Sequence, residues 1–250
     1  MSEALTGRLG ADGVDLPRSP PGEAERSQGY PISRWYLRPL AGRLAGVLAP
    51  SRVRPVHVTL CGLLLSMAAV ATLAARPALA PLAAGLVLAG WFCDRLDGQL
   101  ARRQGTVTRW GGWLDGNVDE LADLALQSAA AWAAAGGQAG SLPLFLLAAF
   151  LGGKYLLVYG LNLEEHLRSN DSPQPPQRHA THSLEAYSGW PRWLRTVWHL
   201  PGNADVRLHL LVVALLSGWL TAELAVVAVY YNLRWIAGYV LVARRLGGER

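Results

Sequence analysis

The chain has 250 residues, of which 51% are hydrophobic and only 16% are charged, and it carries a net charge of +5 at pH 7. Because an average soluble domain carries about 25% charged residues, this composition argues against a soluble fold and predicts one integral membrane domain. The positive charge comes from 22 arginines and one lysine, which in so apolar a chain fits an anionic membrane surface better than a nucleic acid.

The chain begins with a polar stretch rich in proline and glycine, residues 1–29, which we predict to be a disordered tail. In the segment that follows, aromatic and aliphatic side chains alternate with Arg34, Arg38 and Arg43. Helical spacing would place the apolar residues on one face and the arginines on another. We therefore predict an interfacial amphipathic helix at about 31–50, with an ordinary linker as the alternative.

Six apolar segments follow, each close to the ~20 residues that a membrane-spanning helix needs. They lie at about 57–75, 78–103, 112–135, 142–162, 206–220 and 222–243. Short turns join them in pairs, and the longest connection, at about 163–205, is a proline-containing loop. The predicted fold class is all-α: a polytopic integral membrane protein with six transmembrane helices in a single catalytic domain, residues 30–250.

The arginines predict the orientation of these helices. If the N-terminus is cytoplasmic, the three outer turns contain Arg76 alone, whereas the inner loops and both ends contain many arginines. This is the positive-inside distribution of a multi-pass protein of the cell membrane. Both termini and the loop at 163–205 are then expected in the cytoplasm.

Five aspartates lie between the second and third apolar segments, in the stretch DRLDGQLARRQGTVTRWGGWLDGNVDELAD. Asp94 and Asp97 are three residues apart, and Asp115 and Asp119 are four apart, so each pair shares one helix face. The glycine-containing turn between the pairs reverses the chain. The four carboxylates are therefore expected to converge near the inner boundary of the membrane.

Ionised carboxylates at a membrane boundary are unfavourable unless they are neutralised, and no lysine lies near these four. Divalent cations would neutralise them, and an all-oxygen ligand set suits Mg²⁺, Mn²⁺ or Ca²⁺ better than zinc or copper. Two such ions ~3.5–4 Å apart form a clamp for phosphoryl chemistry. The alternative is structural: Asp115 would favour the helix dipole, and Asp119 and Glu120 would be solvated at a helix end.

Residues 94–119 match the pattern D-x2-D-G-x2-A-R-x8-G-x3-D-x3-D without a gap, which resembles the signature of the CDP-alcohol phosphotransferase family. The resemblance implies an enzyme of phospholipid biosynthesis that displaces CMP from a CDP-linked donor, such as CDP-diacylglycerol, with an alcohol. It implies a cofactor of two divalent ions, Mg²⁺ or Mn²⁺, and members of the family are commonly homodimers. By position, Asp94, Asp97, Asp115 and Asp119 resemble metal ligands, Asp119 also resembles the general base, and Gly98, Ala101, Arg102 and Gly111 resemble CDP-binding positions.

Three residues outside this pattern have open roles. Asp123 would compete with Asp119 as the base or would support the ligands. Lys154, the only lysine, lies in an apolar segment, where it would attract an acceptor phosphate or balance the aspartates. Arg207 would bind an acceptor phosphate or anchor its helix at the interface, in a stretch, GNADVRLHL, that resembles family members using inositol phosphate.

Two further alternatives remain open at the level of the sequence. Inositol phosphate, glycerol phosphate, serine and simple amino alcohols all suit the acceptor role. A different class of protein, a divalent-cation transporter or channel, would also place carboxylates inside a membrane. Transporters usually show internal repeats, and this chain shows none, so the transferase is the preferred prediction.

Overall fold

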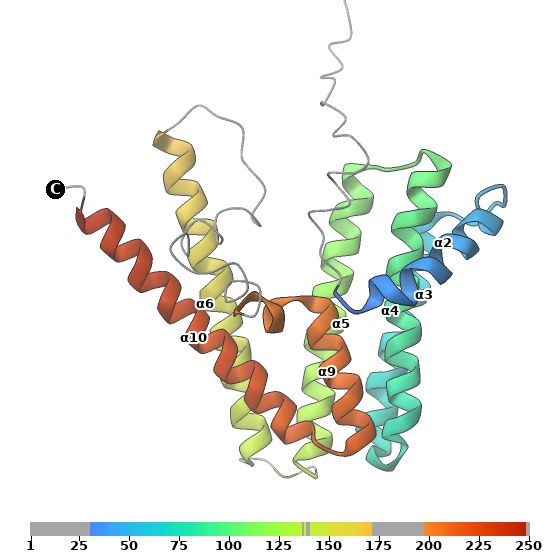
Figure 1. The fold of residues 1–250 in the computed structure, drawn as a ribbon. Helices are drawn as coiled ribbons and strands as arrows, with labels where there is room; N and C mark the ends of the chain where they lie inside the picture. The colour runs from blue at the N-terminus through green and yellow to red at the C-terminus, as the bar shows by residue number, and fades with distance from the viewer. Residues whose placement is uncertain (1–30, 137, 139–140, 172–197, 249–250) are drawn as a thin grey trace, which may run out of the picture.

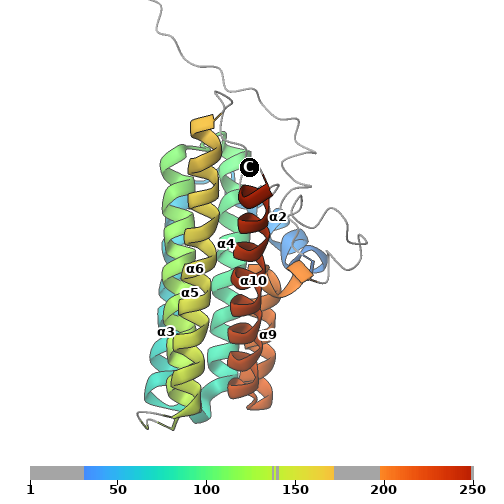
Figure 2. The same ribbon diagram turned by 90° about the vertical axis from the view of Figure 1, so that its left-hand side faces the viewer.

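Helices form all the regular secondary structure in the part of the chain that the computed structural model describes, residues 31–136, 138, 141–171 and 198–248. In chain order the elements are η1 (Ser33–Trp35), α2 (Leu37–Leu48), α3 (Pro55–Ala75), η2 (Pro77–Leu79), α4 (Ala80–Gln104), α5 (Arg109–Ala134), α6 (Leu142–Asp171), η3 (Leu200–Gly202), α9 (Ala204–Ser217) and α10 (Leu220–Gly248). The long helices form one elongated bundle, and α2 lies across it (Figure 1, Figure 2). The prediction of an all-α fold is confirmed.

Four of the helical segments in the described residues are long and apolar enough to cross a membrane: Pro55–Ala75, Pro77–Gln104, Leu142–Glu164 and Leu220–Arg244. Helix α5 differs because its first half carries the acidic residues of the predicted cluster. Helix α9 has 14 residues and is therefore about 21 Å long, shorter than the ~30 Å hydrocarbon core. Six spanning helices therefore stay a prediction.

The start of the predicted cytoplasmic loop differs from the structure. The loop predicted at about 163–205 begins later, because α6 continues as far as Asp171. The residues after 162 are polar but include no proline before Pro173, so nothing in them ends a helix. The predicted tail at 1–29 and residues 172–197 of the predicted loop lie outside the described residues.

The turn between α4 and α5 brings the acidic ends of these two helices together. Gly105 caps the C-terminus of α4, and its φ of 66° is left-handed, a conformation that glycine adopts without strain. Thr108 caps α5, since its side-chain oxygen accepts a hydrogen bond of 3.0 Å from the N–H of Gly111. The chain therefore reverses within a few residues, as the glycine-containing turn predicted.

Helices α3 and α4 approach each other closely where two glycines meet. A Cβ atom on Gly90 would lie 2.8 Å from Oγ of Ser66 and 3.1 Å from the carbonyl oxygen of Gly62, and one on Gly62 would lie 3.0 Å from Cβ of Cys93. Small residues at such a crossing are typical of helices packed in membranes. This contact fixes α4, and with it Asp94 and Asp97, against α3.

On the other side of the bundle, α6 packs along α10 (Figure 1). Phe150 of α6 lies fully buried against Val227 and Tyr231 of α10. Helices α3, α4, α5 and α9 share a second core that includes Leu73, Val87 and other apolar residues. The predicted site residues Lys154 and Arg207 thus come from helices that flank α5.

We predict that Gly90→Val destabilises the protein by about 1–3 kcal/mol, because the new side chain must displace the Gly62 backbone. The measurement is the melting temperature of the detergent-purified protein. The matched control is Gly85→Val on the same helix, where a Cβ would meet nothing within 4 Å. Equal melting temperatures for the two variants would contradict the close approach.

Candidate active site

A cavity of about 270 Å³ lies between α3, α4, α5 and α9. Acidic residues of α4 and α5 line one part of it, and apolar residues such as Leu63, Val87, Leu126 and Leu211 line another. The cavity therefore combines a polar region rich in carboxylates with an apolar region among the helices. This combination suits a ligand that has both an anionic and an apolar part.

Three carboxylates converge on the polar part of this cavity. One oxygen from each of Asp94, Asp97 and Asp115 lies within 4.8 Å of the other two. Asp97 is only 4% exposed and accepts a hydrogen bond of 2.5 Å from Oγ1 of Thr59. The predicted convergence of α4 and α5 thus brings together three of the four predicted metal ligands.

A cation that we did not predict lies beside this cluster. The guanidinium of Arg95 pairs with Asp94 and lies over the ring of Trp91, 4.2 Å from its centroid. A single arginine leaves most of the charge of three ionised carboxylates uncompensated. The set of clustered carboxylate oxygens therefore fits a divalent cation, with the hard oxygen ligands that Mg²⁺ and Mn²⁺ prefer.

Asp119 lines the same cavity but does not belong to the group of three whose oxygens lie within 4.8 Å of one another. It lies one helical turn beyond Asp115 on α5, and it is exposed. This position at the edge of the cluster suits a base that must meet an incoming hydroxyl. Its two predicted roles, metal ligand and base, stay predictions.

The residues predicted to bind CDP lie beyond the cavity, toward the connected ends of α4 and α5. Gly98, Ala101, Arg102 and Gly111 are all absent from the cavity lining. The guanidinium of Arg102 lies over Gly98, with Nη1 3.5 Å from the place that a Cβ would take there. These four residues lie within about one helical turn of Asp97 or Asp115. Nucleotide binding by them stays a prediction.

Among the residues that line the cavity, Thr59 and Gly116 were not predicted from the sequence. Thr59 of α3 holds Asp97, and Gly116 of α5 lines the cavity at a point where a Cβ would meet nothing within 4 Å. Thr59 lies 38 residues before its partner in a segment with the composition of an ordinary apolar helix. Gly116 carried a signal, because it directly follows Asp115 within the motif.

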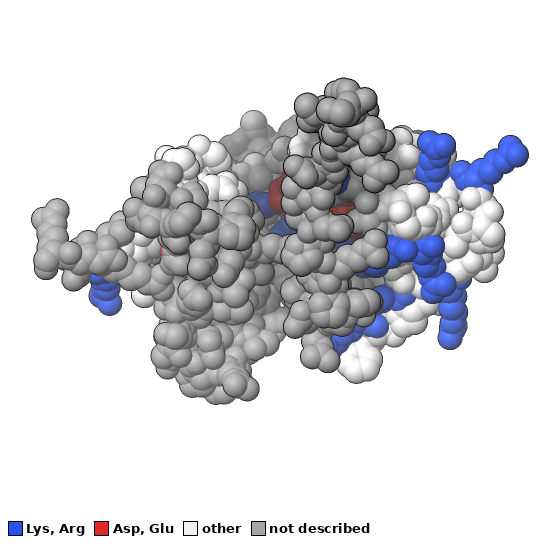
Figure 3. Space-filling model, turned by 90° about the horizontal axis from the view of Figure 1, so that it is seen from above, with Lys and Arg blue, Asp and Glu red and all other residues white. Residues whose placement is uncertain are grey.

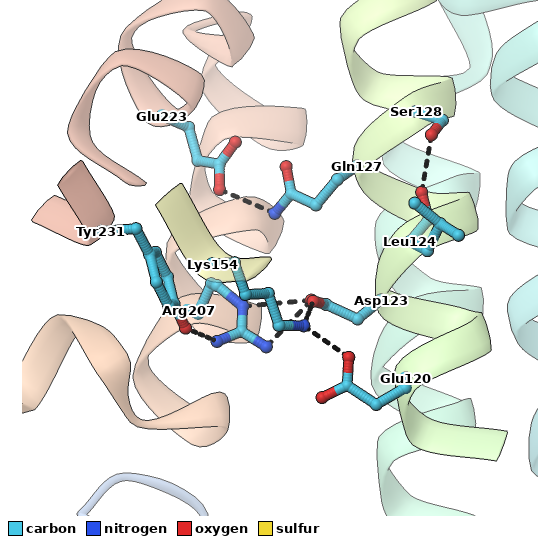
Figure 4. A network of polar contacts seen from close by, with 9 residues as sticks. All are labelled: Glu120, Asp123, Leu124, Gln127, Ser128, Lys154, Arg207, Glu223 and Tyr231. Atoms are coloured by element: carbon cyan, nitrogen blue, oxygen red, sulfur yellow. Dashed lines mark hydrogen bonds and ion pairs between the residues drawn. The ribbon is translucent and has the colours of Figure 1, made fainter. Parts of the chain in front are cut away.

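Lys154 and Arg207, the two residues predicted to bind the acceptor, meet at Asp123 (Figure 4). Nζ of Lys154 lies 2.7 Å from Oδ2 of Asp123 and 2.6 Å from Oε2 of Glu120. Nε and Nη2 of Arg207 each lie 3.0 Å from Oδ1 of Asp123, and Nη1 donates a 2.6 Å hydrogen bond to Oη of Tyr231. Asp123 is therefore held between two cations.

The two carboxylates that contact Lys154 differ in their freedom to move. Asp123 is 19% exposed and is also bound by Arg207, whereas the Glu120 side chain is 68% exposed and has Lys154 as its partner. Arg207, Asp123 and Glu120 all line the cavity that the aspartate cluster faces. The balancing role that the sequence left open for Lys154 is thus present in the structure, and Glu120 is the more exposed of its two carboxylate partners.

One turn beyond Asp123 on α5, a buried polar pair completes this group of residues (Figure 4). Nε2 of Gln127 donates a 3.0 Å hydrogen bond to Oε1 of Glu223 on α10. Both side chains are almost fully buried, and Oε1 of Gln127 and Oε2 of Glu223 have no partner among the described residues. The pair joins α5 to α10, and it was not predicted from the sequence.

Asp205, at the start of α9, ties three elements together. Its side chain is fully buried, and Oδ2 accepts hydrogen bonds from the N–H groups of Ile32 (2.8 Å) and Ser33 (3.0 Å), while Oδ1 accepts one from the indole of Trp91 (3.1 Å). Burial alone would raise the pKa of the Asp205 carboxyl, but these donors hold its pKa below the ordinary value. Asp205 thereby fixes η1 and Trp91, which lines the cavity.

A sequence model of the CDP-alcohol phosphatidyltransferase family matches residues 52–178. An archaetidylinositol phosphate synthase of Methanothermobacter thermautotrophicus is 35% identical over 101 residues, which are 40% of this chain and 47% of that protein. A bifunctional IPC transferase and DIPP synthase of Aquifex aeolicus is 26% identical over 222 residues, which are 86% of this chain and 45% of that protein. A second archaetidylinositol phosphate synthase, from Pyrococcus horikoshii, is 35% identical over 85 residues, which are 34% of this chain and 44% of that protein. The matches span less than half the length of each relative.

We predict that Asp205→Ala lowers the melting temperature of the purified protein, because two buried donors and one partly buried donor lose their acceptor, at about 1–3 kcal/mol for each buried one. Trp91→Phe removes one of these donors and is expected to lower the melting temperature less. The reverse order of the two variants would contradict the role of Asp205 as the shared acceptor.

Proposed function

Because this chain belongs to the CDP-alcohol phosphatidyltransferase family, we propose that it displaces CMP from a CDP-linked lipid donor with an alcohol acceptor, forming a phosphodiester. The single observation that carries this proposal is the convergence of Asp94, Asp97 and Asp115 on one cavity. The apolar part of the same cavity suits a lipid donor. Family membership also decides against the alternative of a cation transporter or channel.

We propose six membrane spans with both termini and the active site in the cytoplasm, in a multi-pass protein of the cell membrane. The four helices that are long and apolar enough to span support the coarser statement that this is a membrane protein. The arginine distribution supports the orientation, since the outer turns hold only Arg76. A second copy of the chain is the proposed partner protein, as in many family members.

The proposed cofactor is a pair of Mg²⁺ or Mn²⁺ ions held by Asp94, Asp97, Asp115 and Asp119. When bound, these ions would supply positive charge that neutralises the donor pyrophosphate and the departing CMP. The chain contributes the fixed positions of the carboxylates. Thr59 orients Asp97 from α3, and the close crossing of α3 and α4 holds Asp97 in place.

In the proposed reaction, the acceptor hydroxyl oxygen attacks the donor phosphorus that carries the lipid. The bond from this phosphorus to the oxygen bridging to CMP breaks, and CMP leaves with that oxygen. Asp119 takes the hydroxyl proton, because it lies at the edge of the cluster and is exposed to the cavity. Gly98, Ala101, Arg102 and Gly111 hold the CDP group beyond the cavity, with Arg102 as the cation for its phosphates.

The proposed acceptor is a phosphorylated polyol, of which inositol phosphate is the first candidate. Lys154 and Arg207 lie together at Asp123 and offer two cations for the acceptor phosphate. Two of the similar proteins are named archaetidylinositol phosphate synthases, which supports an inositol phosphate acceptor for this chain. The GNADVRLHL stretch around Arg207 points to the same acceptor class.

We predict that Asp119→Asn lowers kcat for CMP release about 10²–10⁴-fold, because the amide cannot take the hydroxyl proton. Binding of the CDP-lipid in the presence of Mg²⁺ is expected to persist. Asp97→Asn is the matched variant within the three-carboxylate group, and it is expected to lose metal-dependent donor binding instead. Unchanged turnover of Asp119→Asn would remove this residue from the reaction.

We predict that Glu120→Gln lowers the KM for a phosphorylated acceptor, because it removes the exposed carboxylate that competes for Lys154. Lys154→Gln is expected to raise the same KM about tenfold, as loss of a charge-assisted hydrogen bond does. The KM for the CDP-lipid serves as the control and is expected to stay constant. A KM for the acceptor that changes in the same direction in both variants would contradict the role of Lys154 as the phosphate ligand.

A further inference from the structure

Helix α2 presents three different faces. Leu37, Ala41 and Ala45 are buried, and the two alanines pack against Leu96 and Leu100 of α4. A second face is apolar but exposed: Leu40, Leu44 and Val47 lie on it, and Val47 is 72% exposed. In the described residues, protein covers the first of these faces and leaves the second open.

The third face of α2 forms a groove with α4 that is lined by arginines. Arg34, Arg38 and Arg43 line it from the side of η1 and α2, and Gln99 and Arg103 line it from α4. The remaining lining residues, Pro39, Gly42 and Gly46, are uncharged, so no carboxylate of the described residues lines the groove. Arg34, Arg43 and Arg103 give the described lining of the groove a positive charge, which suits an anion.

Two glycines of α2 allow this groove to form. A Cβ on Gly46 would lie 3.0 Å from Nη1 of Arg103, and a Cβ on Gly42 would lie 2.9 Å from Oε1 of Gln99. The amide of Gln99 is held in turn by hydrogen bonds of 3.2 Å from Nε2 to the carbonyl oxygens of Arg38 and Arg95. The guanidinium of Arg103 therefore lies directly on the backbone of α2.

The groove is separate from the candidate active site. None of its lining residues lines the cavity of the aspartate cluster. It adjoins the last turns of α4, which also carry Asp94 and Asp97, so it lies at the level of the proposed inner membrane boundary. In the view from above, arginine side chains gather where α2 lies, with no acidic side chain of the described residues visible among them (Figure 3).

We propose that this groove binds the phosphate-bearing headgroup of an anionic phospholipid. The arginines provide charge complementarity to a headgroup phosphate at the membrane surface. The exposed stripe of Leu40, Leu44 and Val47 on the same helix assigns the anion to a lipid rather than to a free solute, because this stripe would lie among acyl chains. The site is independent of the proposed catalytic reaction.

The test uses the full chain in nonionic detergent with a chelator, so that the aspartate cluster holds no divalent ion. Native mass spectrometry records binding of dioctanoyl phosphatidylglycerol, of the zwitterionic dioctanoyl phosphatidylcholine, and of glycerol phosphate as the soluble anion. We expect the anionic lipid to bind most tightly. Arg43→Gln and Arg103→Gln are each expected to weaken its binding about fivefold.

Gly46→Leu fills the groove without changing its charge and is expected to weaken binding of the anionic lipid as well. Arg244→Gln, an exposed arginine on α10, is the matched control and is expected to leave binding unchanged. Melting temperatures measured without lipid show that each variant is folded, and Arg43→Gln alone decides the matter if Gly46→Leu does not fold.

Three results would overturn the proposal. Equal binding of the two lipids would remove the role of the headgroup charge. Equal losses in Arg43→Gln and Arg244→Gln would show diffuse attraction in place of a groove. Glycerol phosphate binding as tightly as the anionic lipid would assign the groove to a soluble anion. Because binding is measured without turnover, these results do not depend on the outcome of the catalytic experiments.

Discussion

Charge inside an apolar helical bundle must be neutralised, and this requirement decides how the polar residues of this protein are arranged. Asp123 satisfies it within the chain, because Lys154 of α6 and Arg207 of α9 bind its two oxygens. That single carboxylate joins three helices. The buried Gln127–Glu223 pair then links α5 to α10 one turn further along α5.

The aspartate cluster of α4 and α5 meets the same requirement differently. Arg95 forms an ion pair with Asp94. Asp97 and Asp115 face the cavity, and among the described residues no ion pair joins either of them to a cation of the chain. Asp123 thus stabilises the bundle, whereas Asp97 and Asp115 remain available to bind a ligand. This arrangement agrees with the membership of the chain in the CDP-alcohol phosphatidyltransferase family.

Local spacing predicted the helices and the facing aspartates well, because a helical period and a glycine turn are set by neighbouring residues. It predicted the candidate roles of Lys154 and Arg207 but not their meeting at Asp123, which lies 31 residues from one and 84 from the other. Thr59, Arg95 and Asp205 were missed for the same reason: spacing shows which face a side chain occupies, and only the packed bundle shows its partner. Helix α6 ends later than predicted because polar composition alone does not end a helix.

The contact between Asp205 and the backbone of Ile32 spans 173 residues, which gives it a consequence for biogenesis. A ribosome adding ~5–20 residues per second needs about 9–35 s to synthesise the chain from one partner to the other. Until then the start of η1 lacks its carboxylate acceptor. The contact of η1 with Asp205 therefore forms only after the start of α9 has been synthesised, which makes it a late step in the assembly of the nascent protein.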